Sequence, residues 1–207
     1  MTDWRREAAR DNARWCDLMC RAHGIRGTFT DLAWTSPVRT PPYYPDAVTL
    51  SPGATAADLL PHLDAGPGAS IKDSFATLDL PGFEVLFEAR WIHREAPGRA
   101  GTNWRVVRDA AALAGWERAC GMKDLFLPPL LDEATIVHAP DLSSGAVLTA
   151  TGPAVGVSNV FGDWGGVLAT AAELFPGRPL VGYESDPAPA LRHGFTTIGP
   201  LRVWLKA

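Results

Sequence analysis

The chain has 207 residues, 46% of them hydrophobic and 20% charged, which is enough for one large or two small domains with a buried core. The net charge of -4 argues against a nucleic-acid-binding surface, which usually carries a basic excess. No apolar run approaches the roughly 20 residues that span a bilayer, and residues 1–14 are too polar for a secretory signal. Because the three cysteines suit free thiols, we expect a cytoplasmic protein that binds neither membrane nor nucleic acid.

The first half of the chain alternates short apolar runs with turn residues. The expected elements are a helix over residues 3–23, strands over 28–34 and 47–50, a helix over 55–63, and strands over 70–75 and 83–92. Gly24 is a natural end for the first helix. Thr55 can cap the second helix, but Pro61 should end or kink it. Residues 94–102 form the best candidate linker.

The second half begins after this linker. Its expected elements are a strand over residues 104–107, a helix over 109–120, strands over 135–138, 146–151 and 154–161, a helix over 163–175, a strand over 180–183, a short helix over 186–193 and a strand over 195–205. Gly152-Pro153 predicts a hairpin, and Gly199-Pro200 predicts a bulge or bend in the last strand.

The two halves share an order of elements. In each, a short strand, a helix and a second strand lead to a Gly-Phe pair, Gly82-Phe83 or Gly194-Phe195, and then to a strand with a distal tryptophan, Trp91 or Trp204. One interpretation is a pair of related units, residues 1–98 and 103–207. The other is the general likeness of β-α-β-α-β passages. Both predict a mixed sheet that is mainly antiparallel at its ends.

The most specific stretch lies near the C-terminus. Leu-Val-Gly-Tyr-Glu at residues 180–184 precedes a short helix, Gly194-Phe195 and a returning strand that ends at Trp204. With the elements before it, this half resembles the acyl-CoA-binding half of the GNAT (Gcn5-related) N-acyltransferases. The resemblance implies an α+β fold, a mixed and mostly antiparallel sheet flanked by helices, with the first half as a shortened, degenerate relative.

The resemblance also implies a cosubstrate site. Acetyl-CoA or another acyl-CoA would bind beside the strand over residues 155–161, with its diphosphate at the next helix N-terminus, where free N–H groups and the helix dipole favour an anion. By this resemblance, six residues are expected to contact the cosubstrate: Val157, Asn159, Phe161, Gly162, Gly165 and Gly166.

Two positions depart from the family pattern. The expected phosphate turn lacks the usual Arg or Gln at its start, and it carries the carboxylate of Asp163 where the diphosphate would approach. The tyrosine that often protonates the leaving thiolate is replaced by Ala190. These departures favour an alternative to catalysis, an inactive GNAT-like protein that binds a ligand or a partner.

Acyl transfer to an amine needs a proton acceptor, a group that polarises the carbonyl and a donor to the departing thiolate. At the end of a buried strand, Glu184 is the candidate base and Tyr183 the candidate donor. Ser158, a polar residue in an apolar strand, is the third candidate catalytic residue. Simpler roles stay open for each: a helix cap, a core tyrosine and a polar strand edge.

Contacts to the acceptor are expected from the first half. Glu88, Arg90 and His93 share one side of the strand over residues 83–92 and its continuation, and Tyr43 lies in a rigid Pro-rich loop. A solvated strand face and a structural connection are the alternatives. In the internal repeat, Lys72 of the first half occupies the position that matches residues 182–184 of the second half. A charge pair on an edge strand is the simpler interpretation of Lys72.

A third hypothesis concerns metal. Cys16, Cys20 and His23 share one helix face at i, i+4 and i+7, but no fourth ligand is within sequence reach, so we expect no metal site. The leading prediction is therefore an acyl-CoA-dependent N-acyltransferase that acts on a small amine. A homodimer is compatible with the eight tryptophans.

Overall fold

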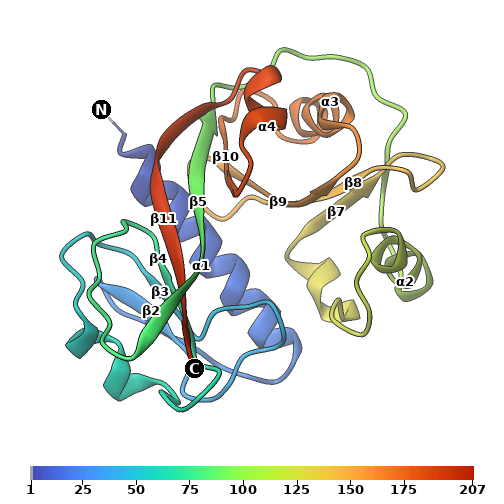
Figure 1. The fold of residues 1–207 in the computed structure, drawn as a ribbon. Helices are drawn as coiled ribbons and strands as arrows, with labels where there is room; N and C mark the ends of the chain where they lie inside the picture. The colour runs from blue at the N-terminus through green and yellow to red at the C-terminus, as the bar shows by residue number, and fades with distance from the viewer. Residues whose placement is uncertain (1) are drawn as a thin grey trace.

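Eleven strands form one continuous sheet in the computed structural model, which describes residues 2–207 (Figure 1). The sheet order is β1-β2-β3-β4-β11-β5-β10-β9-β8-β7-β6. The strands are β1 Thr28–Phe29, β2 Ala33–Thr35, β3 Ala47–Thr49, β4 Ser70–Asp73, β5 Phe83–Arg94, β6 Arg105–Val106, β7 Thr135–His138, β8 Gly145–Thr149, β9 Val155–Phe161, β10 Leu180–Glu184 and β11 Thr196–Lys206. The helices are α1 Trp4–Ala22, α2 Ala110–Ala119, α3 Trp164–Leu174 and α4 Ala188–Arg192, with 3-10 turns η1 Ala56–Asp58, η2 Leu60–His62 and η3 Pro128–Asp132.

The two longest strands, β5 and β11, form an antiparallel pair at the centre of the sheet (Figure 1). The outer edge of β5 pairs with β10, and the outer edge of β11 pairs with β4. The last strand of each predicted half therefore borders the other half, and the two halves share one sheet. Four strands lie beyond β11 and five beyond β5, with parallel β3 and β4 on one side of the central pair and parallel β9 and β10 at the matching places on the other. A division at residues 98–103 stays a prediction.

Helices cover both faces of the sheet. Alternate residues of β10 enter different cores, because Leu180 packs with α3 and α4 whereas Val181 packs with Ala8 and Ala9 of α1. Figure 1 shows α1 crossing behind β5 and β11. Ala8 and Ala9 of α1 pack in this core, Trp4 stacks on His93 of β5, and Arg5 donates a 2.6 Å hydrogen bond to the Pro200 carbonyl oxygen of β11. No helix within residues 2–207 has the length and apolar character needed to cross a bilayer.

Most predicted elements are confirmed, and two are corrected. The strand expected over residues 28–34 is instead the two strands β1 and β2, because the Thr30 hydroxyl accepts hydrogen bonds from the backbone N–H groups of Leu32 and Ala33 and makes a turn. The helix expected over residues 55–63 is only η1 and η2, and Pro61 inside η2 lacks the N–H donor that a longer helix needs. The Pro-rich turn at residues 128–129 begins the 3-10 turn η3.

Candidate functional site

The parallel strands β9 and β10 separate soon after they meet. Their pairing joins Val155 to Leu180 and Gly156 to Val181, and it ends there. The register of β9 against β8 then shifts, and Asn159 adopts a positive φ of 51°, which marks a bulge that turns β9 aside. At the apex of the opening, an ideal Cβ on Gly182 would lie 2.6 Å from the Val157 carbonyl oxygen, so only glycine allows this approach.

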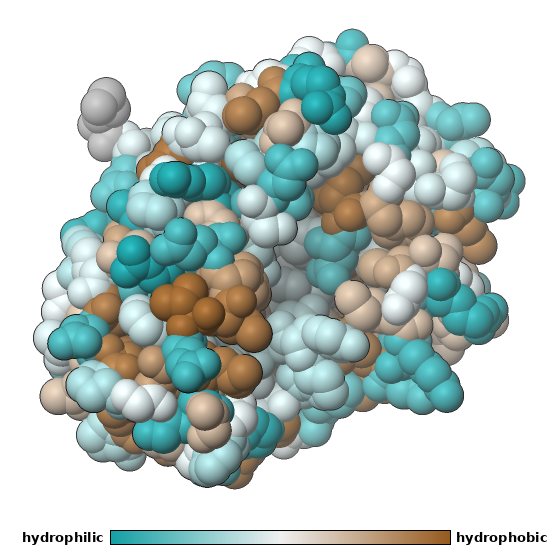
Figure 2. Space-filling view, in the orientation of Figure 1, coloured by the Kyte–Doolittle hydropathy of each residue, from teal (hydrophilic) through white to brown (hydrophobic). Residues whose placement is uncertain are grey.

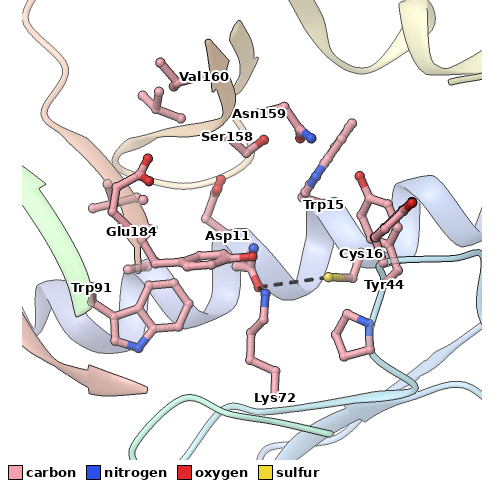
Figure 3. A pocket seen from close by; sticks show the side chains of 18 of the residues that line it. Asp11, Trp15, Cys16, Tyr44, Lys72, Trp91, Ser158, Asn159, Val160 and Glu184 are labelled. Atoms are coloured by element: carbon pink, nitrogen blue, oxygen red, sulfur yellow. Dashed lines mark hydrogen bonds between the residues drawn. The ribbon is translucent and has the colours of Figure 1, made fainter. Parts of the chain in front are cut away.

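A cavity of about 270 Å³ begins at this opening. Its walls come from α1, β4, β5, β9, β10, the loop around Tyr43 and the segment after α2 that contains Met122 and Leu125. Figure 3 shows Ser158 on β9 and Glu184 on β10 on the two sides of the opening. In the space-filling view the same region is the hollow at the centre of the molecule (Figure 2).

Glu184 is the principal titratable group at the mouth of the cavity. Its side chain is half-buried, and burial raises its pKa from 4.5 to about 7, with a further contribution from the negative charge of Asp186. A carboxyl group with this pKa is partly deprotonated near neutral pH. It can therefore accept a proton there, and it returns the proton readily.

A second carboxyl group, Asp11 of α1, lines the cavity deeper down. Burial raises its pKa to about 7, although the Thr149 hydroxyl donates a hydrogen bond of 3.0 Å to it. The carboxylate lies against the backbone of Gly156, where any side chain would occupy its place. Two carboxyl groups in one cavity make it favourable to a cation at neutral pH.

Lys72 of β4 enters the cavity from the opposite side (Figure 3). It is only 3% exposed, its Nζ donates a 2.8 Å hydrogen bond to Asn12 Oδ1, and it lies 4.1 Å from the centre of the Tyr183 ring. The charge pair expected on an edge strand is wrong, because β4 lies between β3 and β11. The neighbouring Asp73 instead accepts hydrogen bonds from the backbone N–H groups of Phe75 and Leu78.

Comparison with known proteins rests on structure, because no family model and no curated protein matches the sequence. A crystal structure of a protein assigned to the GNAT acetyltransferase family from Novosphingobium aromaticivorans matches 96% of this chain and 99% of its own, with a TM-score of 0.59 and 15% identity. The chain has a GNAT fold. Partial matches are GCN5-related N-acetyltransferases from Kribbella flavida (14% identity, 66% of this chain and 42% of that one, TM-score 0.42) and Sphaerobacter thermophilus (11%, 70% and 62%, TM-score 0.41). The predicted α+β class and mostly antiparallel sheet are confirmed.

Within this GNAT fold, several predicted site residues meet at the cavity. They are Glu184, Tyr183, Ser158, Val157, Asn159 and Tyr43. Val157 contributes little side-chain surface, because its side chain packs in the core below α3. Tyr183 is held edge-on against Trp91 at 5.6 Å, and Lys72 lies over its ring. Tyr43 is 84% exposed and has a φ of 72°, an unusual conformation for a bulky residue at the rim of a cavity.

The predicted diphosphate turn has a different arrangement. The N–H groups of Gly165 and Gly166 donate hydrogen bonds of 2.8 and 2.9 Å to the Asp163 carboxylate, which caps α3. Phe161 packs on Trp116. Gly162 turns the chain at a φ of 73°. These four predicted cosubstrate residues, Phe161, Gly162, Gly165 and Gly166, do not line the cavity.

The three acceptor residues expected on β5 also lie outside the cavity. Glu88 forms a surface ion pair of 2.8 Å with Arg202, and Arg90 is exposed. His93 is buried and stacks on Trp4 with ring centres 4.7 Å apart, and burial lowers its pKa. Arg90 pairs with Glu184 across β5 and β10, but its side chain does not line the cavity.

The Cys16, Cys20 and His23 set does not come together as a metal site. Burial raises the pKa of Cys16 to about 11 and that of Cys20 to about 12, so both remain protonated thiols. His23 Nε2 lies 2.8 Å from the Leu125 carbonyl oxygen. Within residues 2–207, no three His, Cys, Asp or Glu side chains lie close enough to share a metal ion.

Sequence reasoning missed Asp11 and Asn12, and for Lys72 it favoured a charge pair on an edge strand. The signal for the first two was present, since Asp11 lies three residues after Ala8 and four before Trp15, on the apolar face of the predicted helix. A charged residue on such a face points to a polar cavity or a buried network. Lys72 was marked only by its place in the internal repeat, and its burial depends on the long-range pairing of β4 with β11 and on contacts with Asn12 and Tyr183.

Proposed function

We propose that the chain is an N-acyltransferase that moves an acyl group from a thioester to a small amine at the opening between β9 and β10. The observation that carries the proposal is Glu184, a carboxyl group with a pKa of about 7 at the mouth of that opening. The GNAT fold supports the same reaction class, and the nearby carboxyl group of Asp11 favours a cationic acceptor.

The chain supplies proton transfer and orientation. An amine is mostly protonated at neutral pH, so it must lose a proton before its nitrogen can attack a carbonyl carbon. Glu184 accepts this proton, a contribution that is typically about 10²–10⁴-fold in rate. We assign Tyr183 the protonation of the leaving group and Ser158 a hydrogen bond across the opening, since both line the same cavity.

The acyl donor fits the opening in part. Beyond the last paired residues, the facing edges of β9 and β10 offer backbone groups to an amide-bearing chain such as pantetheine. The donor supplies the activated acyl group. The turn before α3 does not fit a diphosphate, because Asp163 already accepts both N–H groups and would repel a second anion. Acetyl-CoA or another acyl-CoA therefore stays a prediction based on the fold resemblance.

A second candidate function has specific support. The capped α3 turn and the fully buried Ala190, at the place of the usual proton donor, both suit a GNAT-like protein that binds a ligand without turning it over. Such a protein would use the same cavity. Binding without chemistry would distinguish it from a transferase.

The test measures thiol release from acetyl-CoA, longer acyl-CoAs and S-acetylpantetheine in the presence of a panel of amines. We expect amine-dependent release with at least one donor and its loss in Glu184→Gln. Glu173→Gln, an exposed glutamate on α3, is the matched control and should behave as wild type. Amine-dependent release that is equal in Glu184→Gln would refute the assignment. Melting-temperature shifts with no release for any pair would favour the binding protein.

A further inference from the structure

Lys72 carries a buried positive charge that the chain does not neutralise. The side chain is 3% exposed, and its one hydrogen-bond partner is the neutral amide of Asn12. Within residues 2–207, no carboxylate lies within 4.0 Å of Lys72 Nζ. A buried ammonium without a counter-ion is costly, and the Tyr183 ring offsets only part of that cost. An anion that enters the cavity would neutralise this charge.

A second cavity, of about 470 Å³, adjoins the first at this lysine. Both cavities are lined by Lys72, Tyr183 and the loop residues Tyr43–Pro45. The far wall of the second cavity is apolar and comes from Leu86, Phe87, Val203 and Leu205 of the central strand pair.

Leu86 is 55% exposed and Phe87 is 37% exposed, which is unusual for large apolar side chains on a central strand pair. In the space-filling view, a hydrophobic area lies over the lower part of β5 and borders the central hollow (Figure 2).

The order of groups along the two cavities is carboxyl, ammonium, apolar wall. Glu184 and Asp11 favour an amine, Lys72 at the junction favours a carboxylate, and the β5 and β11 side chains favour a hydrocarbon group. We propose that the acceptor is an amino acid with an apolar side chain, whose carboxylate binds Lys72 and whose side chain occupies the second cavity. The inference rests on the proposed function, because Glu184 must receive the amino group.

The test is calorimetric binding to the full chain without any acyl donor, so that it does not depend on catalysis. The probes are L-phenylalanine, L-leucine, phenethylamine, which lacks the carboxylate, and 3-phenylpropanoate, which lacks the amine. We expect L-phenylalanine to bind about tenfold or more tightly than either truncated analogue.

Variants then separate the two contacts. Lys72→Met should weaken L-phenylalanine binding about tenfold and leave phenethylamine binding unchanged. Lys206→Met is the matched control, because Lys206 also stacks on an aromatic ring, that of Phe83, but lines neither cavity. Leu86→Ser changes an exposed residue, so it does not threaten folding. It should weaken the binding of L-phenylalanine and leave the binding of L-alanine, a further probe, unchanged.

The inference is overturned if neither L-phenylalanine nor L-leucine binds at about 10 mM, or if Lys72→Met binds L-phenylalanine as wild type does. Amino-acid binding that needs Lys72, with no acyl transfer from any donor, would support this inference and refute the proposed transferase. Acyl transfer to amines that lack a carboxylate, with no amino-acid binding, would refute this inference and support the proposed transferase.

Discussion

The two parallel strand pairs of the sheet, β3 with β4 and β9 with β10, have the same topology, but the first pair is closed and the second opens into the cavity. Each pair is joined in register at two positions. Beyond them, the first pair is closed by the Thr49 hydroxyl, which accepts a 2.8 Å hydrogen bond from Ser74 N, and every residue of β3 is buried. The second pair diverges at the Asn159 bulge and borders the cavity. The closed pair therefore has a side-chain hydrogen bond beyond its last paired residues, where the open pair has a bulge.

The connections between the paired strands differ as well. The closed pair is joined through η1 and η2, which Pro61 keeps short, whereas the open pair is joined through the eleven-residue helix α3. The closed side still serves the site, because Lys72 on β4 reaches the cavity that begins at the open side. One half provides the opening, and the other contributes a charged wall.

The largest expected effect is on the open side. Glu184→Gln should lower kcat/KM for amine acylation by about 10²–10⁴-fold, because the amide cannot accept the proton. In wild type, kcat/KM should fall as the pH drops below about 7, since Glu184 becomes protonated there. A pH-rate profile measured on both proteins tests this, and a wild-type profile that stays flat from pH 5 to 8 would contradict it.

The next largest effect is on the free energy of unfolding, which the buried Asp11 carboxylate lowers. Its folded-state pKa of about 7 lies above the ordinary value of 3.8, so the folded chain binds more protons than the unfolded one between these values. Stability should therefore fall as the pH rises through this window. Asp11→Asn should be more stable than wild type by roughly 2–4 kcal/mol at pH 8 and should show little difference near pH 4.

Urea denaturation at both pH values gives this difference. The exposed Asp31→Asn should show no such divergence from wild type. A constant difference between wild type and Asp11→Asn at the two pH values would mean that Asp11 titrates normally.

A matched pair of substitutions compares the closed and open sides directly. Thr49→Val removes the acceptor of the buried Ser74 N–H and should destabilise the fold by about 1–3 kcal/mol. Ser158→Val, at a half-buried position on the cavity wall, should change stability by less than about 0.5 kcal/mol. Thermal or urea denaturation gives both values. Equal effects would show that the hydrogen bond is not what closes the first pair.

The smallest expected effect is at the α3 turn. Asp163→Ala frees the N–H groups of Gly165 and Gly166 and should strengthen coenzyme A binding about tenfold, or create it. The matched control is Asp109→Ala, which removes the cap of α2, where Asp109 accepts a hydrogen bond from Ala112 N. Both variants should lower the free energy of unfolding by about 1 kcal/mol, but Asp109→Ala should not change coenzyme A binding. Isothermal titration tests the pair. Weaker binding in Asp163→Ala would show that the diphosphate does not use this turn.

Much of the fold follows from local sequence signals. The periodic pattern over residues 3–23 and the capping Asp109 predict helices that the structure contains as α1 and α2. The Gly199-Pro200 bend appears as a register shift in β11. The errors arise where one side chain overrides a pattern, as the Thr30 hydroxyl does between β1 and β2, and Pro61 does in η2. Local chemistry of this kind competes with propensity and is difficult to weigh from sequence alone.

The site was less predictable, for a physical reason. Glu184 could be identified from the sequence because it ends a buried strand and its own side chain is a carboxyl group. Asp11 lies on the apolar face of a predicted helix, but its meeting with Lys72 at one cavity depends on the packing of α1 and β4 beside β10, which no local pattern encodes. Glu88 was misleading because the exposed face of β5 alternates as a site-facing strand would, yet it pairs with Arg202.

The most direct test of the difference between the open and closed strand pairs is a backbone amide NMR titration with S-acetylpantetheine, a donor without the diphosphate. We predict shift changes at residues 157–161 of β9 and at residues 182–184 of β10, with none at residues 47–49 and 73–74 of the closed pair. Changes confined to the closed pair, or no change at about 10 mM ligand, would contradict the assignment of the opening between β9 and β10 as the acyl-donor site.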